Sequence, residues 1–102
     1  MKILSEVNDK TTFYKIIDIL IENKNKKTLI AFNGAWGEIG GLFQFSDYIP
    51  MESNSSINSI ITQAIQEKYE VLIFYTEVLT PEDIKTIEEM EQGIEIILSN
   101  AK

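Results

Sequence analysis

The chain has 102 residues, a formal net charge of −7, and neither His nor Cys; its basic residues are all Lys. Without Cys it can form no disulfide, no thiolate nucleophile and no zinc–thiolate site. Without His and Arg it lacks a base of near-neutral pKa, a Ser-His-Asp type triad and a bidentate guanidinium for phosphate. We therefore expect a non-enzymatic protein with no cofactor and no bound metal.

The size and apolar content predict one domain. Residues 1–102 match the common size of a single domain, and a hydrophobic content of 44% is enough for a core. Neither a signal peptide nor a membrane-spanning run is visible, so we expect a cytoplasmic protein. Abundant Ile, Asn and Lys, all with AT-rich codons, suggest a bacterial or phage origin.

The charge is unevenly distributed along the chain. Residues 1–50 carry six acidic residues and six lysines, whereas residues 51–102 carry ten acidic residues and three lysines. An acidic second half disfavours nucleic acid and anionic membranes as partners, because phosphate neutralisation drives most nucleic-acid binding. It favours a protein partner with a basic surface.

The first half predicts a strand, a helix and two further strands. A strand is expected at 3–7, and a helix capped by Asn8 or Asp9 follows. The apolar stripe of this helix comprises Phe13, Ile16, Ile17, Leu20 and Ile21. The Asn- and Lys-rich residues 23–27 end the helix. The apolar run 28–32 predicts a buried strand, and the aromatic run 42–49 predicts another, stopped by Pro50.

The second half predicts two helices alternating with two strands. Residues 53–56 supply N-cap candidates for a helix whose stripe comprises Ile57, Ile60, Ile61, Ala64 and Ile65. The run 71–75 suits the centre of a sheet, and 94–98 is the last strand. Between them, Thr80, Pro81 and Asp83 form a capping-box start, with Leu79 and Ile84 as a hydrophobic staple. Gly93 is expected in the left-handed C-terminal position.

The order β-α-β-β-α-β-α-β predicts a small α/β fold with three helices on a mixed, mostly parallel sheet of four or five strands. The second and third strands are separated by a short loop on this assignment. We therefore expect them to be antiparallel neighbours, unless one of them is not a strand.

The loop between them, within FNGAWGEIGGLF at 32–43, is the most distinctive segment. Its G-x-x-G-x-x-G-G spacing matches neither a dinucleotide fingerprint nor a P-loop. The dipeptide Asn33-Gly34 favours a wide hairpin that would expose Trp36, Glu38 and Ile39. Alternatively, the loop packs so that its Trp caps the core, or Asn33, Gly34 and Gly37 form a backbone cradle for a small ligand or nucleotide, with Asp47 nearby.

The favoured hypothesis is a protein-binding module that docks on or masks a partner, as immunity proteins, antitoxins or phage-encoded inhibitors do. Trp36 and Ile39, with Glu38 between them, would anchor the contact. Acidic residues near the third helix would steer the partner, namely Glu88, Glu89 and Glu91. A homodimer or larger assembly through Phe43, Phe45 and Tyr48 of an edge strand is the third alternative.

Overall fold

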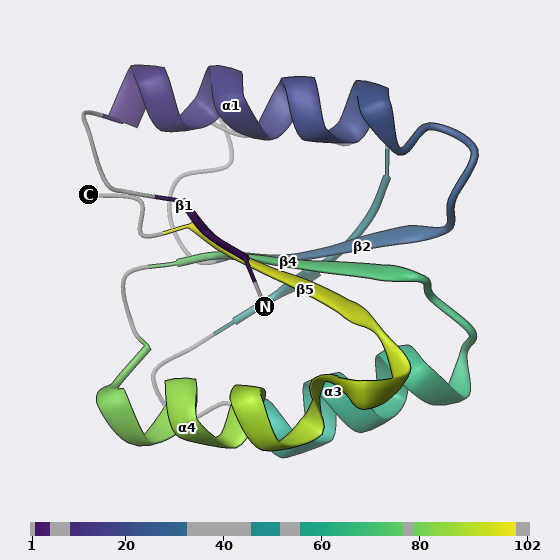
Figure 1. The fold of residues 1–102 in the computed structure, drawn as a ribbon, viewed down its shortest axis with the longest axis vertical. Coiled ribbons are helices and arrows are strands. Elements are labelled where there is room, and N and C mark those ends of the chain that lie inside the picture. The colour runs from purple at the N-terminus through teal and green to yellow at the C-terminus, as the bar shows by residue number, and fades with distance from the viewer. Residues whose placement is uncertain (1, 5–8, 33–45, 52–55, 77–78, 100–102) are drawn as a thin grey trace.

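The computed structural model describes residues 2–4, 9–32, 46–51, 56–76 and 79–99 (Figure 1). The described strands and helices follow the predicted order. They are β1 (Lys2–Leu4), α1 (Asp9–Glu22), β2 (Thr28–Phe32), β3 (Asp47–Pro50), α3 (Ile57–Gln66), β4 (Val71–Tyr75), α4 (Pro81–Met90) and β5 (Glu95–Ser99). A single 3-10 turn, Glu91–Gly93, joins α4 to β5.

The strands form one five-stranded sheet in the order β1-β5-β4-β2-β3. Each neighbouring pair runs parallel, so the sheet built from the described strands is parallel rather than mixed. α1 covers one face of the sheet, and α3 and α4 cover the other (Figure 1). The predicted α/β fold is confirmed, in the form of three layers.

The expectation that the second and third strands are antiparallel neighbours is wrong. β2 and β3 are neighbours, but they pair in parallel, with Leu29 opposite Asp47 and Phe32 opposite Pro50. The error lies in the start of the third strand, which was expected at Leu42 and is found at Asp47. Residues 33–46 therefore connect β2 to β3, and a connection between two parallel strands needs about a dozen residues. β2 and β3 are therefore not the two arms of a hairpin, and the glycine-rich residues 33–43 lie outside the described residues.

β3 lies at the edge of the sheet and includes Pro50 instead of ending before it. The amide of Met51 donates to the carbonyl of Phe32 at 2.6 Å, so Met51 directs its backbone groups toward β2. Backbone direction alternates along a strand, so Pro50 faces away from β2. Proline therefore removes an N–H on the outer side of this edge, where its absence leaves the sheet intact and discourages pairing with another strand.

Alternating side chains of the central strands build two separate cores. In β4, Val71, Ile73 and Tyr75 contribute to the core under α1, while Leu72 and Phe74 contribute to the core under α3 and α4. All five residues are buried, because β4 lies between β5 and β2 with helices on both faces. The prediction of a central strand at 71–75 is confirmed.

The two predicted helical stripes are confirmed only in part. Ile16 and Leu20 of α1 are buried, and so is Ile19, which was not assigned to the stripe; Ile21 is instead 49% exposed. On α3, the residues Ile57, Ile60, Ile61 and Ala64 are buried, whereas Ile65 is 39% exposed. In both helices the last predicted stripe residue lies at the rim, since the sheet covers a narrower arc than the apolar pattern spans.

The ends of α3 and α4 are fixed by local hydrogen bonds. Ser56 caps α3, and the capping box of α4 is present, with Thr80 Oγ1 accepting from Asp83 N at 3.1 Å and Asp83 Oδ2 from Thr80 N at 2.9 Å. The expected role of Gly93 is wrong. α4 ends at Met90, and Gly93 closes the 3-10 turn without a positive φ.

Candidate interaction surfaces

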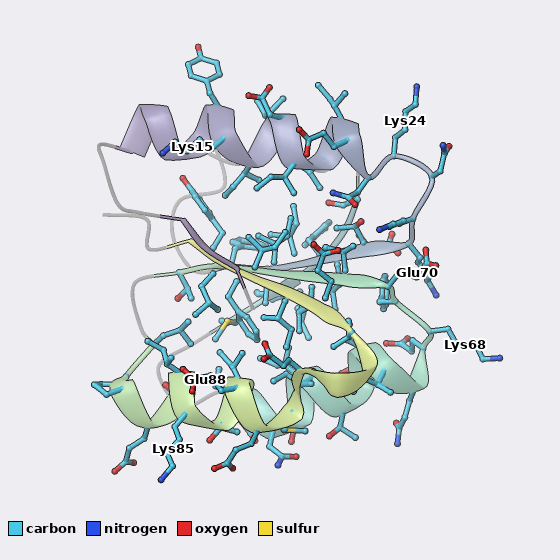
Figure 2. The ribbon with its side chains drawn as sticks, viewed as in Figure 1. Lys15, Lys24, Lys68, Glu70, Lys85 and Glu88 are labelled. Atoms are coloured by element: carbon cyan, nitrogen blue, oxygen red, sulfur yellow. The ribbon has the colours of Figure 1, made fainter. Side chains whose placement is uncertain are left out.

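The outward face of α4 is acidic. Its exposed acidic side chains are those of Glu82, Glu88 and Glu89, and Lys85 lies among them. Figure 2 shows Lys85 extending away from the sheet on this helix. Only Ile87 of α4 is fully buried, so most of the helix faces solvent. The predicted steering residues Glu88 and Glu89 therefore share one exposed surface, which carries three carboxylates and one ammonium.

Two other acids that the sequence groups with this helix lie elsewhere. Glu91 belongs to the 3-10 turn after α4 and is partly buried, so it is less exposed than Glu88 and Glu89. Glu95 begins β5, where its Oε2 lies 3.9 Å from Nζ of Lys26. Both residues are half-exposed at this contact, so the ion pair contributes little to stability.

The outward face of α1 has a different character. Tyr14 and Ile21 are exposed there, and the half-buried Ile17 lies between them in the sequence. Asp18 and Glu22, also exposed, lie on one side of this apolar row. Sequence reasoning assigned Ile17 and Ile21 to the core and did not single out Tyr14. The available signal was that apolar residues of this helix cover more than half of its circumference.

A polar network joins the amino ends of the strands. The hydroxyl of Tyr69 donates to Oδ2 of Asp47 at 2.7 Å, which links the start of β4 to the start of β3. Nζ of Lys27 lies 4.4 Å from the centre of the Tyr69 ring and donates to the carbonyl of Glu67 at 2.7 Å. Oε2 of Glu70 accepts from the backbone amide of Lys27 at 3.2 Å. Lys68 and Glu70 lie at this side of the molecule in Figure 2.

This network raises the pKa of Tyr69 from 10.0 to about 12. Burial is the largest cause, followed by the hydrogen bond to Asp47 and the negative charges of Asp47 and Glu67. The hydroxyl of Tyr69 therefore keeps its proton, and can donate to Asp47, at pH values above its ordinary pKa of 10.0. The amino ends of parallel strands are not where α/β sheets bind ligands, so we interpret the network as structural.

The position of Asp47 does not fit the predicted ligand cradle. Asp47 was expected at the end of the third strand, but it is the first residue of β3 and lies at the amino edge. Asn33 and Gly34 follow Phe32, which ends β2 at the carboxyl edge. Asp47 thus lies at the opposite end of the sheet from Phe32, the last described residue before the other predicted cradle residues. Its observed partner is Tyr69.

Several predicted site residues lie outside the described residues. They are Asn33, Gly34, Trp36, Gly37, Glu38 and Ile39, and also Phe43 and Phe45 of the proposed assembly surface. Tyr48 is described: it lies on the edge strand β3, and its ring is centred 5.9 Å from that of Phe32. The neighbouring Pro50 weakens the expected pairing of this edge with another chain.

Among the described residues, the carboxylates do not gather into any group of three or more that could hold a metal ion. Within the same ranges, every helix is too short or too polar to cross a bilayer.

The strand order identifies one further candidate site, at which a small ligand could bind. β2 and β4 are neighbours, and Phe32 pairs with Tyr75 at their carboxyl ends. The chain continues from β2 to β3 on one side of this pair, and from β4 to β5 on the other. Open α/β sheets bind ligands at such a reversal of strand order.

Comparison with known proteins found no match: no family model, no curated protein and no solved structure is similar enough to this chain to inform its function.

Proposed function

We propose that this chain is a non-enzymatic protein-binding module that docks on, and masks, a partner with a basic surface. The observation that carries the proposal is the solvent-exposed surface of α4, which carries Glu82, Glu88 and Glu89 and the single Lys85. Charges on an exposed helix contribute little to folding, but they accelerate and select encounters with an oppositely charged protein. Immunity proteins, antitoxins and phage-encoded inhibitors are the types of protein that act in this way.

Affinity in this proposal comes from the anchors predicted in the sequence. Trp36 and Ile39, with Glu38 between them, would supply the apolar contact that exposed carboxylates alone cannot give. α4 then contributes mainly to the rate of association. Substitution of the anchor residues should therefore lower the affinity, and substitution of the acidic residues of α4 should lower the association rate.

The first experiment identifies a partner. Tagged protein recovers bound proteins from lysate of the source organism, or from cells infected by its phage, with the Trp36→Ala variant as the control bait. We expect that variant to bind the partner at least about 30-fold more weakly, which corresponds to about 2 kcal/mol. If Trp36→Ala unfolds the protein, the tryptophan belongs to the core and the anchor assignment is wrong.

The second experiment tests the role of α4 against that purified partner. The double variant Glu88→Gln/Glu89→Gln should lower the association rate constant several-fold at low salt and leave the dissociation rate constant nearly unchanged. A matched control, Glu67→Gln/Glu95→Gln, makes the same change in net charge at exposed residues outside α1 and α4. Equal effects of the two double variants would show that overall charge matters and that α4 is not the docking face.

A second candidate function is the binding of a small ligand or nucleotide at the carboxyl ends of β2 and β4. The reversal of strand order between these neighbours favours it, and Asn33, Gly34 and Gly37 follow β2 directly. Thermal unfolding with and without common nucleotides is the test, and a rise of several degrees would support this function. The variant Asp47→Asn should keep any such rise, because Asp47 lies at the amino edge.

A further inference from the structure

The outward face of α1 carries apolar side chains that the fold leaves in contact with solvent. Tyr14 is 56% exposed and Ile21 is 49% exposed, and Ile17 between them is half-buried. Spacings of three and four residues place the three side chains in one row along the helix, about 10 Å long. Rows with this spacing are what an amphipathic helix buries against another helix.

Charges of both signs flank this row on one side. Lys15 and Glu22 are seven residues apart, so they point in nearly the same direction and are separated by about 10 Å along the axis. Figure 2 shows Lys15 on this helix. Two copies of α1 that run antiparallel about a two-fold axis bring the same flank of each helix together in reverse order. Tyr14 then faces Ile21 of the second copy, and Lys15 faces Glu22 of the second copy.

From this self-complementarity we infer that α1 is the contact of a homodimer. The distribution of charge agrees with a second copy of this chain as the partner of α1. α1 carries three acidic residues and two lysines, so its net charge is −1 and repulsion between two copies is small. The acidic face of α4 lies on the opposite side of the sheet (Figure 1), and the two α4 helices of such a dimer therefore point away from each other. Anionic lipid or nucleic acid would find no comparable complement on α1.

The dimer should be weak. A contact made by one pair of helices is smaller than the roughly 1,600 Å² that standard stable complexes bury in total, and we expect a dissociation constant in the micromolar range. Asp18 also limits the affinity, because it lies close to the two-fold axis and faces its own copy. The variant Asp18→Asn should therefore strengthen the dimer by about two- to three-fold.

Sedimentation velocity of the purified chain between about 5 and 500 μM tests the inference. We expect the apparent mass to rise toward that of a dimer, and Ile21→Asp to weaken the association by at least ten-fold. Ile65→Asp is the matched control, since Ile65 is an exposed isoleucine on α3, in the opposite layer. Circular dichroism of each variant verifies that the fold is retained.

Charge reversal gives a second, more specific readout. Because of the two-fold axis, Lys15→Glu and Glu22→Lys each disturb two ion pairs, and each should weaken the dimer by about five-fold. The double variant Lys15→Glu/Glu22→Lys should restore wild-type association. A monomer at all concentrations, a dimer that tolerates Ile21→Asp, or a double variant weaker than either single variant would overturn the assignment. The experiment needs no partner protein, so its result is independent of the proposed function.

Discussion

The two helical layers differ in how they are held and in what they expose. α3 and α4 have N-terminal ends that are fixed by side-chain caps, and α4 exposes carboxylates. The described part of α1 relies on the burial of Ile16, Ile19 and Leu20, and it exposes Tyr14 and Ile21. Among the described residues, α1 exposes two large apolar side chains, Tyr14 and Ile21, whereas the opposite layer exposes one, Ile65. The charges on α4 act over a distance and can speed the encounter with a partner, whereas the apolar row on α1 can be buried in a direct contact.

The largest predicted difference in stability is between substitutions of two neighbouring residues of α1. Leu20 is 1% exposed, so Leu20→Ala should destabilise the fold by about 2–5 kcal/mol. Ile21→Ala removes a side chain that is 49% exposed, and it should change the stability by about 0.5 kcal/mol or less. Urea unfolding followed by fluorescence at nanomolar concentration, well below the micromolar dissociation constant expected for the dimer, measures both. Similar losses for the two variants would mean that Ile21 belongs to the fold, and the contrast between the layers would disappear.

The next effect tests whether α4 depends on its cap. Thr80→Ala removes one acceptor of the capping box and should destabilise the protein by about 1 kcal/mol. Lys85→Ala, on the exposed side of the same helix, should change the stability by only a few tenths of a kcal/mol. Thermal unfolding of the two variants at equal concentration makes the comparison. An effect of Thr80→Ala no larger than that of Lys85→Ala would contradict the importance of the cap.

A pH experiment tests the network beside α3. The pKa of Tyr69 is about 12 in the folded protein and 10.0 in the reference state. Below pH 10 both states keep the proton, so the stabilisation is fully present. As pH rises from 10 toward 12 the unfolded chain loses the proton first, and the stabilisation is lost. Wild type should therefore lose stability more steeply over this range than Tyr69→Phe, measured by urea unfolding. Parallel curves would show that the hydroxyl of Tyr69 is not held by Asp47.

The smallest effect is a gain in stability. Lys68 follows α3 with a φ of 64°, and the amide of Tyr69 donates to the carbonyl of Ala64 at 3.0 Å, which is the helix-end pattern that favours glycine. Lys68→Gly should stabilise the protein by about 0.5 kcal/mol, because relief of backbone strain outweighs the entropy that glycine adds to the unfolded chain. Lys24→Gly, in a turn without positive φ, should destabilise it. A loss of stability on Lys68→Gly would show that the backbone at Lys68 is not strained.

Local patterns predicted the elements well and their arrangement less well. Continuous apolar runs identified β2 and β4, and the Thr80–Asp83 spacing identified the start of α4, because each depends on neighbouring residues. The start of β3 was placed at Leu42 because aromatic residues precede Asp47, and that one error reversed the direction expected of the strand.

The candidate surfaces were predictable only where exposure follows from composition. Glu88 and Glu89 were assigned to an exposed face because charged side chains are seldom buried. The exposure of Ile21 depends on how far the sheet extends under α1, and no local pattern contains that information. The hydrogen bond between Tyr69 and Asp47 joins residues from different elements, and it follows from the pairing of β3 beside β2.

The pairing of β1 with β5 has a consequence for synthesis of the chain. Lys2 is opposite Ile97, so the first strand pairs with residues that are translated 95 positions later. At roughly 5–20 residues per second, β1 is synthesised about 5–20 s before β5. β2, β3 and β4 can associate during that interval, since they are neighbours in the sheet. We therefore predict that β1 joins the sheet only after β5 has been made, and that a ribosome stalled before β5 would present a sheet that lacks this edge.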